Sequence, residues 1–183
     1  MFNREKSAKL YNSLAYWVSI WMVYFISLVI PNFIYAVVTY FSSDLIKSAS
    51  GFFLYFTVLY ISSMCAYFIC NLLTMLSPNA QTAMGIYPIL TFVNVLFSGY
   101  FQYIDNMQTW LKYWLPNLSF MRWGYQCLVC NLLTDNPDLP DGSKYLAQNS
   151  FDTVNDYESF IILLGFTFTF VAILVIRIRY KYM

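Results

Sequence analysis

The chain has 183 residues, with ten basic and nine acidic side chains, so its net charge at neutral pH is +1. Hydrophobic residues make up 60% of it and charged residues only 10%, whereas a soluble domain carries about 25% charged residues. The composition therefore predicts an all-α integral membrane protein and excludes a soluble globular domain. The absence of a basic surplus also argues against nucleic acid as a partner.

Charge-free stretches predict where the helices cross the membrane. Residues 10–43, 48–104 and 159–176 contain no charged side chain. Because a helix needs roughly 20 apolar residues to cross a bilayer, the first and third stretches each hold one span and the second holds two. We therefore predict four transmembrane helices.

The four predicted spans cover about residues 16–40, 52–76, 83–103 and 159–176. Prolines fall inside the first span (Pro31) and the third (Pro88), and a kink is expected where a proline removes a backbone donor. The short sequence "SPNAQT" separates the second and third spans as a turn.

Between the last two spans lies an aromatic segment at about residues 107–134. Its central part, "WLKYWLPNLSFMRWGY", holds three Trp, two Tyr and two positive charges in sixteen residues. Trp and Tyr favour the headgroup level of a bilayer, and Lys or Arg can reach that level from a helix end. We expect a short re-entrant or interfacial helical segment, broken at Pro116, followed by an external loop at about residues 135–158.

The distribution of positive charge predicts the orientation of the chain. Three basic residues precede the first span and three follow the last, whereas the 135–158 connection has six acids and a single lysine. Since short cytoplasmic flanks are enriched in Lys and Arg, both termini are expected to be cytoplasmic. Nothing in the sequence indicates which membrane the protein occupies.

Residues that could carry catalysis or bind a metal are scarce. The chain has no His and no G-x-x-x-x-G-K-[ST] phosphate-binding motif, so we predict no enzyme activity, no metal site and no cofactor bound by this chain. Cys127 and Cys130 have the spacing of a redox pair, yet they lack the βαβ context of such a pair. We interpret these two, together with Cys65 and Cys70, as small hydrophobic residues of helices.

A few polar residues leave alternatives open. Asn117 and Ser119 fit the glycosylation pattern, although the interfacial position would limit an enzyme's access to Asn117. The predicted spans also contain Asn32, Asn71 and Asn94, which could pair helices or contact a ligand, and helix pairing is the favoured interpretation.

Four stretches resemble a known family in their order and spacing. They are "REKSAKLY", "SLVIPNFIYAVVTYF", "LFSGYF" and "LSFMRWGYQCLVCNLL", and together they resemble the carboxyl-terminal part of the membrane domain of G-type (White/pleiotropic drug resistance-like, ABC-2 type) ATP-binding cassette transporters. The resemblance implies that residues 1–183 form a partial transmembrane domain, equivalent to the last four of six spans. It also implies a re-entrant element before the last span and no nucleotide-binding domain in this chain.

The resemblance also implies two groups of functional residues. Arg4, Glu5 and Tyr11 would belong to the loop that contacts the nucleotide-binding domain, although Lys9 stands where the family usually has Gly. The resemblance implies that a substrate cavity at the dimer axis is lined by three residues of the third span, Pro88, Phe92 and Val95. It also implies that an apolar plug above this cavity is formed by Tyr100 and Phe101.

The function implied is that of a membrane component of an ATP-driven transporter for lipids or amphipathic compounds, working as a homo- or heterodimer in contact with membrane lipid. ATP and Mg²⁺ would be bound by a nucleotide-binding domain that this chain does not contain. The alternative is a truncated, non-transporting protein that pairs with a full-length transporter and modulates it. An independent ion channel is disfavoured, because the predicted spans carry no ionisable residue.

Overall fold

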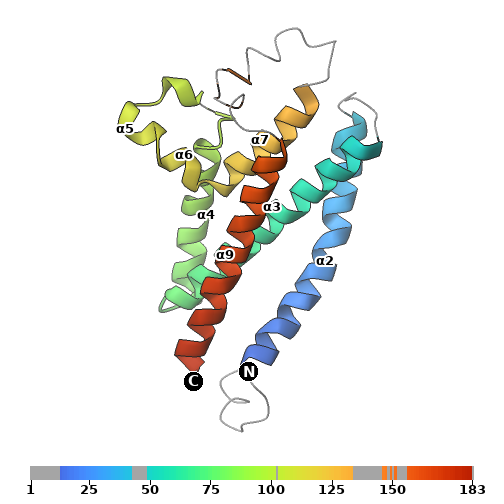
Figure 1. Ribbon diagram of the computed structural model, residues 1–183. Helices are drawn as coiled ribbons and strands as arrows, with labels where there is room; N and C mark the ends of the chain where they lie inside the picture. The colour runs from blue at the N-terminus through green and yellow to red at the C-terminus, as the bar shows by residue number, and fades with distance from the viewer. Residues whose placement is uncertain are drawn as a thin grey trace.

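The computed structural model describes residues 13–42, 49–101, 103–133, 146–147, 149, 151 and 156–182. In these residues all regular secondary structure is helical, as the composition predicts. Figure 1 shows an elongated bundle in which the start of the first described helix and the end of the last lie at the same end of the molecule. The predicted coupling residues Arg4, Glu5 and Tyr11 lie outside the described residues, as does most of the predicted external loop.

Three long helices form the body of the bundle: α2 (Ser13–Ser42), α3 (Ala49–Leu76) and α9 (Asp156–Tyr182) (Figure 1). Each is long and apolar enough to cross a membrane. They overlap the first, second and fourth predicted spans, and α2 runs without interruption through Pro31. Polar side chains inside these helices bond to their own backbone; Ser27 Oγ, for example, donates to the Val23 carbonyl at 2.8 Å. Such bonds satisfy hydroxyl groups where no water is available.

The third predicted span is shorter than expected. Its helix, α4 (Ala80–Leu96), has 17 residues and passes through Pro88, but it ends seven residues before the predicted boundary at Tyr103. Beyond Leu96 the chain turns, and Gly99 adopts a positive φ of 89°. The apolar run continues through this turn, so composition alone overestimates the helix. The count of four spans is therefore not confirmed: three of the described helices meet the length of a span.

Short helical pieces connect α4 to α9. They are η1 (Ile104–Asn106), α5 (Thr109–Lys112), α6 (Leu115–Leu118) and α7 (Phe120–Leu133). All are too short to span a bilayer, as expected for the aromatic segment.

The predicted break at Pro116 is wrong. Pro116 lies in the first turn of α6, where its missing N–H costs nothing because that donor has no helical partner. The chain breaks instead at Tyr113 and Trp114, before α6, and at Ser119, after it.

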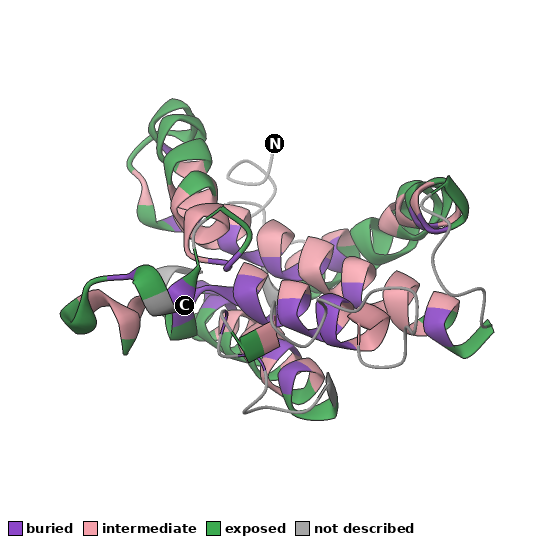
Figure 2. Ribbon diagram, turned by 90° about the horizontal axis from the view of Figure 1, so that it is seen from above, coloured by how far each residue is buried: buried purple, intermediate pink, exposed green. Residues whose placement is uncertain are grey.

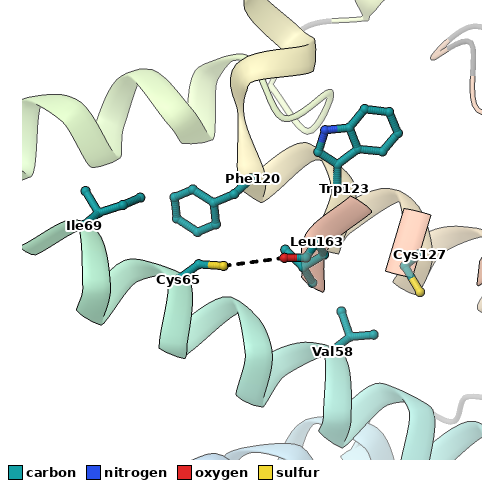
Figure 3. Packing of buried hydrophobic residues seen from close by; sticks show 7 residues of the cluster. All are labelled: Val58, Cys65, Ile69, Phe120, Trp123, Cys127 and Leu163. Atoms are coloured by element: carbon teal, nitrogen blue, oxygen red, sulfur yellow. Dashed lines mark hydrogen bonds between the residues drawn. The ribbon is translucent and has the colours of Figure 1, made fainter. Parts of the chain in front are cut away.

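Helix α3 is the centre of the packing, with contacts to α2, α4, α7 and α9. Figure 2, the view from above, shows buried residues concentrated where these helices meet and exposed residues on the outer helices. One buried cluster joins α3 to α7 and α9 (Figure 3); among its members are Val58 and Cys65 of α3, Trp123 of α7 and Leu163 of α9. The Cys65 thiol lies 3.9 Å from the Leu163 carbonyl oxygen and 3.0 Å from Thr167 Oγ1.

Candidate functional site

Helix α4 has one packed side and one open side. On the packed side, Ala83 is buried, and Tyr87 and Leu90 contact the cluster formed by α3, α7 and α9. On the open side Phe92 is 60% exposed, and Pro88, one turn before it, is exposed too. The structure thus places Pro88 and Phe92 on a common uncovered apolar surface.

Val95 is the third residue that the sequence places on this surface. It is half-buried and lies at the edge of the open side, where α4 approaches its end. Its carbonyl accepts a 2.7 Å bond from Ser98 Oγ, and the same Oγ accepts a 3.3 Å bond from the Tyr100 N–H. The backbone of Val95 therefore helps to form the turn that directs Tyr100 away from the helix.

The turn after α4 requires glycine at position 99. A side chain is strained at a φ of +89°, and a Cβ built there would lie 3.1 Å from the Phe151 ring and 3.2 Å from Asn149 Oδ1. Asn149 and Phe151 are both buried, and they come from the chain beyond α7. Asn149 and Phe151 therefore pack directly against the end of α4.

Four aromatic rings form a row at this end of the molecule. Tyr100 meets Phe101 edge to face at a centroid distance of 4.9 Å and meets Tyr125 of α7 at 5.8 Å. Tyr125 in turn contacts Phe151 at 6.1 Å. Tyr100 and Phe101, the predicted plug residues, are 63% and 62% exposed, so they lie at the open end of the row. Tyr125 and Phe151 complete the row and were not predicted: Tyr125 belongs to an aromatic motif, whereas no local signal marks Phe151.

A buried cation holds the start of α7 in place. Arg122 is only 7% exposed, and its Nη1 donates a hydrogen bond to Asn117 Oδ1. The guanidinium carbon lies 5.1 Å from the centre of the Trp123 ring, and Trp123 Nε1 donates to the Asn117 carbonyl at 3.2 Å. Burial lowers the pKa of Arg122, because the protein withdraws water from its charge. Asn117 and Trp123 supply the compensating contacts, so α6 and α7 are joined at this point.

The Asn117 side chain, the predicted glycosylation acceptor, has partners at both ends. Its Nδ2 donates to the Tyr113 carbonyl at 3.0 Å, and its Oδ1 accepts from Arg122. Ser119, the third residue of the motif, is buried and donates to the Asn94 carbonyl at 2.8 Å. A glycan on Asn117 would have to be attached before these contacts form, or it would prevent them from forming. Glycosylation stays a prediction.

The remaining polar candidates lie in packing positions. Asn32 Oδ1 accepts a 2.8 Å bond from Ser63 Oγ, which joins α2 to α3. Asn71 and Asn94 each donate to a carbonyl of their own helix, four residues earlier. Cys127 and Cys130 are buried in apolar clusters and are not joined by a disulfide, and the described residues contain no group of three potential metal ligands.

Comparison with known proteins shows which family the chain resembles. The model of the family described as ABC-2 type transporter matches residues 1–133. ABC transporter G family member 22 of Dictyostelium discoideum is 22% identical over 131 residues, which cover 72% of this chain and 21% of that protein. ABC transporter G family member 7 of Arabidopsis thaliana is 33% identical over 75 residues, or 41% of this chain and 9% of that protein.

A third relative, the brefeldin A resistance protein of Schizosaccharomyces pombe, is 27% identical over 99 residues, or 54% of this chain and 6% of that protein. The chain thus spans about a fifth or less of the length of these relatives. The family match covers most of the chain, and the long apolar helices agree with it. The chain therefore belongs to the ABC-2 type transporters, is similar to G family members among them, and is a multi-pass membrane component of an ATP-binding cassette transporter.

Proposed function

We propose that this chain helps to move lipids or amphipathic, apolar compounds across a membrane, with ATP and Mg²⁺ bound by a nucleotide-binding domain outside it. The observation that carries the proposal is the open apolar side of α4. Pro88 and Phe92 are exposed there, and the exposed rings of Tyr100 and Phe101 follow directly beyond the helix end. A surface of this kind suits an apolar ligand, because binding sites for such ligands are lined mainly by hydrophobic and aromatic side chains.

A partner copy would turn this open side into an enclosed cavity. The surface on α4 is uncovered by the rest of the described chain, so a second membrane domain facing it, identical or related, would close it on two sides. Tyr100 and Phe101 would then narrow the end of the cavity nearest to the segment of Asn149 and Phe151. We therefore propose that the chain works as part of a homo- or heterodimer.

The proposed orientation puts both termini in the cytoplasm. Figure 1 supports it, because the start of α2 and the end of α9 lie at one end of the bundle. The three basic residues near each terminus favour the cytoplasmic side for that end. Arg4, Glu5 and Tyr11 would then be on the side where a nucleotide-binding domain docks.

The test is transport by a reconstituted complex. The full chain is co-expressed with ATP-binding cassette half-transporters of the G type, the complexes are isolated in detergent, and ATP-dependent movement of a fluorescent phospholipid is followed in vesicles. We expect association, and we expect Phe92→Ala to slow transport several-fold. Phe168→Ala is the matched control, since Phe168 is 72% exposed on α9, away from α4. Failure to associate, or equal slowing by both variants, would contradict the proposal.

The same complexes test the modulator alternative. Large exposed apolar residues on α2, such as Ile26 at 72% exposure, provide a surface that could pair with a relative without taking part in transport. A modulator would associate with the half-transporter and lower its transport, or leave it unchanged, and Phe92→Ala would then have no effect of its own.

A further inference from the structure

A cavity of about 450 Å³ lies on the packed side of α4, away from the surface considered above. Its walls come from α3, α4, α6, α7 and α9. At 100° per residue, Leu90, which lines it, lies about 160° from both Pro88 and Phe92 around the helix axis. The cavity and the open side of α4 are therefore separate sites.

The cavity wall is almost entirely apolar. Three polar residues line it, and each donates its hydrogen bond to the protein itself. Ser119 Oγ donates to the Asn94 carbonyl at 2.8 Å, Asn94 Nδ2 donates to the Leu90 carbonyl at 3.0 Å, and Thr169 Oγ1 donates to the Gly165 carbonyl at 2.8 Å. Among the described residues that line the cavity, none is charged. The walls offer contacts to hydrocarbon and no counter-charge to a polar or ionic ligand.

The position of the cavity indicates where such hydrocarbon comes from. Two of the helices that line it, α3 and α9, are long enough to span a membrane, so the cavity lies at membrane depth. Along α4 and the residue after its end, the lining runs from Leu90 to Phe97, about two helical turns or roughly 10 Å. Along α9 it includes Phe166 and Phe170, one turn apart. The space is thus extended along the helices, as an acyl chain is in a bilayer.

The cavity reaches the molecular surface at α6. Leu118 lines it and is 61% exposed. Beside this opening, Trp110, Tyr113 and Trp114 of the α5–α6 segment are exposed to between 48% and 73%. Trp and Tyr mark the level of the headgroups in membrane proteins. A molecule in the cavity would therefore have its polar end at the headgroup level and its apolar end among the helices.

We propose that the cavity holds one acyl chain of a resident bilayer phospholipid, with the headgroup beside α5 and α6. The lipid fills the space between α3, α4 and α9 and is not the transported molecule. A volume of about 450 Å³ lies within the range of roughly 300–1,000 Å³ found for ligand sites. The proposal requires only that the chain sits in a bilayer, so it stands or fails independently of transport.

Photo-crosslinking in vesicles tests the assignment. The full chain is placed in phosphatidylcholine vesicles that contain phosphatidylcholine with a diazirine midway along one acyl chain, and the adducts are mapped by mass spectrometry after irradiation. We expect adducts concentrated in residues 69–73, 90–97 and 166–170, above the level on the exposed side of α2. Cholesterol with a diazirine on its rings serves as a second probe.

A matched pair of substitutions on α3 shows whether the cavity itself binds the chain. Leu73→Trp places a larger side chain in the cavity, whereas Leu76→Trp makes the same change on a side chain that is 51% exposed. We expect Leu73→Trp to reduce adducts in 90–97 and 166–170 several-fold and Leu76→Trp to leave them unchanged. Val93→Phe, a smaller increase in volume, replaces Leu73→Trp if that variant does not fold.

Three results would overturn the proposal. The first is a pattern of adducts spread evenly over all exposed helix surfaces. The second is equal labelling of the two Trp variants. The third is preferential labelling of the cavity by the cholesterol probe, which would assign it to a sterol.

Discussion

Helices α2 and α7 differ in how many of their side chains are buried by the rest of the protein. Helix α2 has 30 residues, and of its described side chains only Trp21, Ala36 and Tyr40 are buried. Helix α7 has 14 residues and buries eight of them, including Arg122 and Gln126. The longer and more apolar helix is the less enclosed by protein.

The difference follows from the solvent that each helix meets. In lipid, association between apolar helices gains no hydrophobic free energy, so α2 needs only a few specific contacts to α3. Helix α7 carries the guanidinium of Arg122, which is costly to expose to hydrocarbon and which contacts Asn117 and Trp123 instead. It is stable where protein surrounds it. The comparison predicts that substitutions around α7 destabilise the fold more than equivalent substitutions along α2.

The largest effect is expected at Gly124 of α7. A Cβ at this position would lie 2.7 Å from Ser62 Oγ of α3, so the larger side chain of Gly124→Leu requires the Ser62 side chain or the helices to move, and it should lower the free energy of unfolding by about 3 kcal/mol. Thermal unfolding of the purified protein in detergent measures the loss. Gly165→Leu on α9 is the matched control, because no atom lies within 4 Å of a Cβ built there. Similar losses at both positions would show that the close contact of α7 with α3 is unimportant.

A smaller effect is expected at the junction of α6 and α7. Asn117→Ala removes the hydrogen-bond partner of the buried Arg122 side chain, which should cost about 2 kcal/mol, since bonds to charged groups contribute more than neutral ones. The double variant Asn117→Ala/Arg122→Met should recover part of this loss, because it leaves no buried charge without a partner. The same unfolding assay compares the two. If the double variant is less stable than the single one, Arg122 has another role.

The smallest effect is expected at the contact between α2 and α3, where Ser63 of α3 bonds to Asn32 of α2. Ser63→Ala removes the 2.8 Å bond to Asn32 and should cost about 0.6 kcal/mol, the average for hydrogen bonds between membrane helices. Ser27→Ala is the control, because Ser27 bonds only within its own helix, to the Val23 carbonyl. Equilibrium unfolding in mixed detergent resolves the difference. A loss at Ser63 as large as that at Gly124 would remove the contrast between α2 and α7.

The long helices were the predictable part of this fold. Uninterrupted apolar sequence between charged flanks predicts α2, α3 and α9 to within a few residues at most boundaries, because length and the absence of charge alone make a helix suited to lipid. The end of α4 was not predictable in this way. Its apolar run continues to Ile104, and what ends the helix at Leu96 is a turn covered by Asn149 and Phe151, residues more than forty positions later.

The residues of the candidate site also differ in whether the sequence alone could place them. Pro88 and Phe92 could be placed on one side of a helix from their spacing, and the structure leaves that side uncovered. The contacts of Tyr100 with Tyr125, and of Tyr125 with Phe151, depend on how α7 and the following chain are folded back, which no local pattern contains. The break at Pro116 was misplaced because a proline that opens a helix and one that interrupts a helix look alike in a sequence.

The glycine at the end of α4 has an evolutionary consequence. A side chain at position 99 is strained by the positive φ, and it requires the side chains at positions 149 and 151 to shift by a few tenths of an ångström or to be replaced. We therefore expect a substitution at position 99 to be tolerated only together with changes at positions 149 or 151. A residue without a side chain thus limits what can stand at two positions about fifty residues further along the chain.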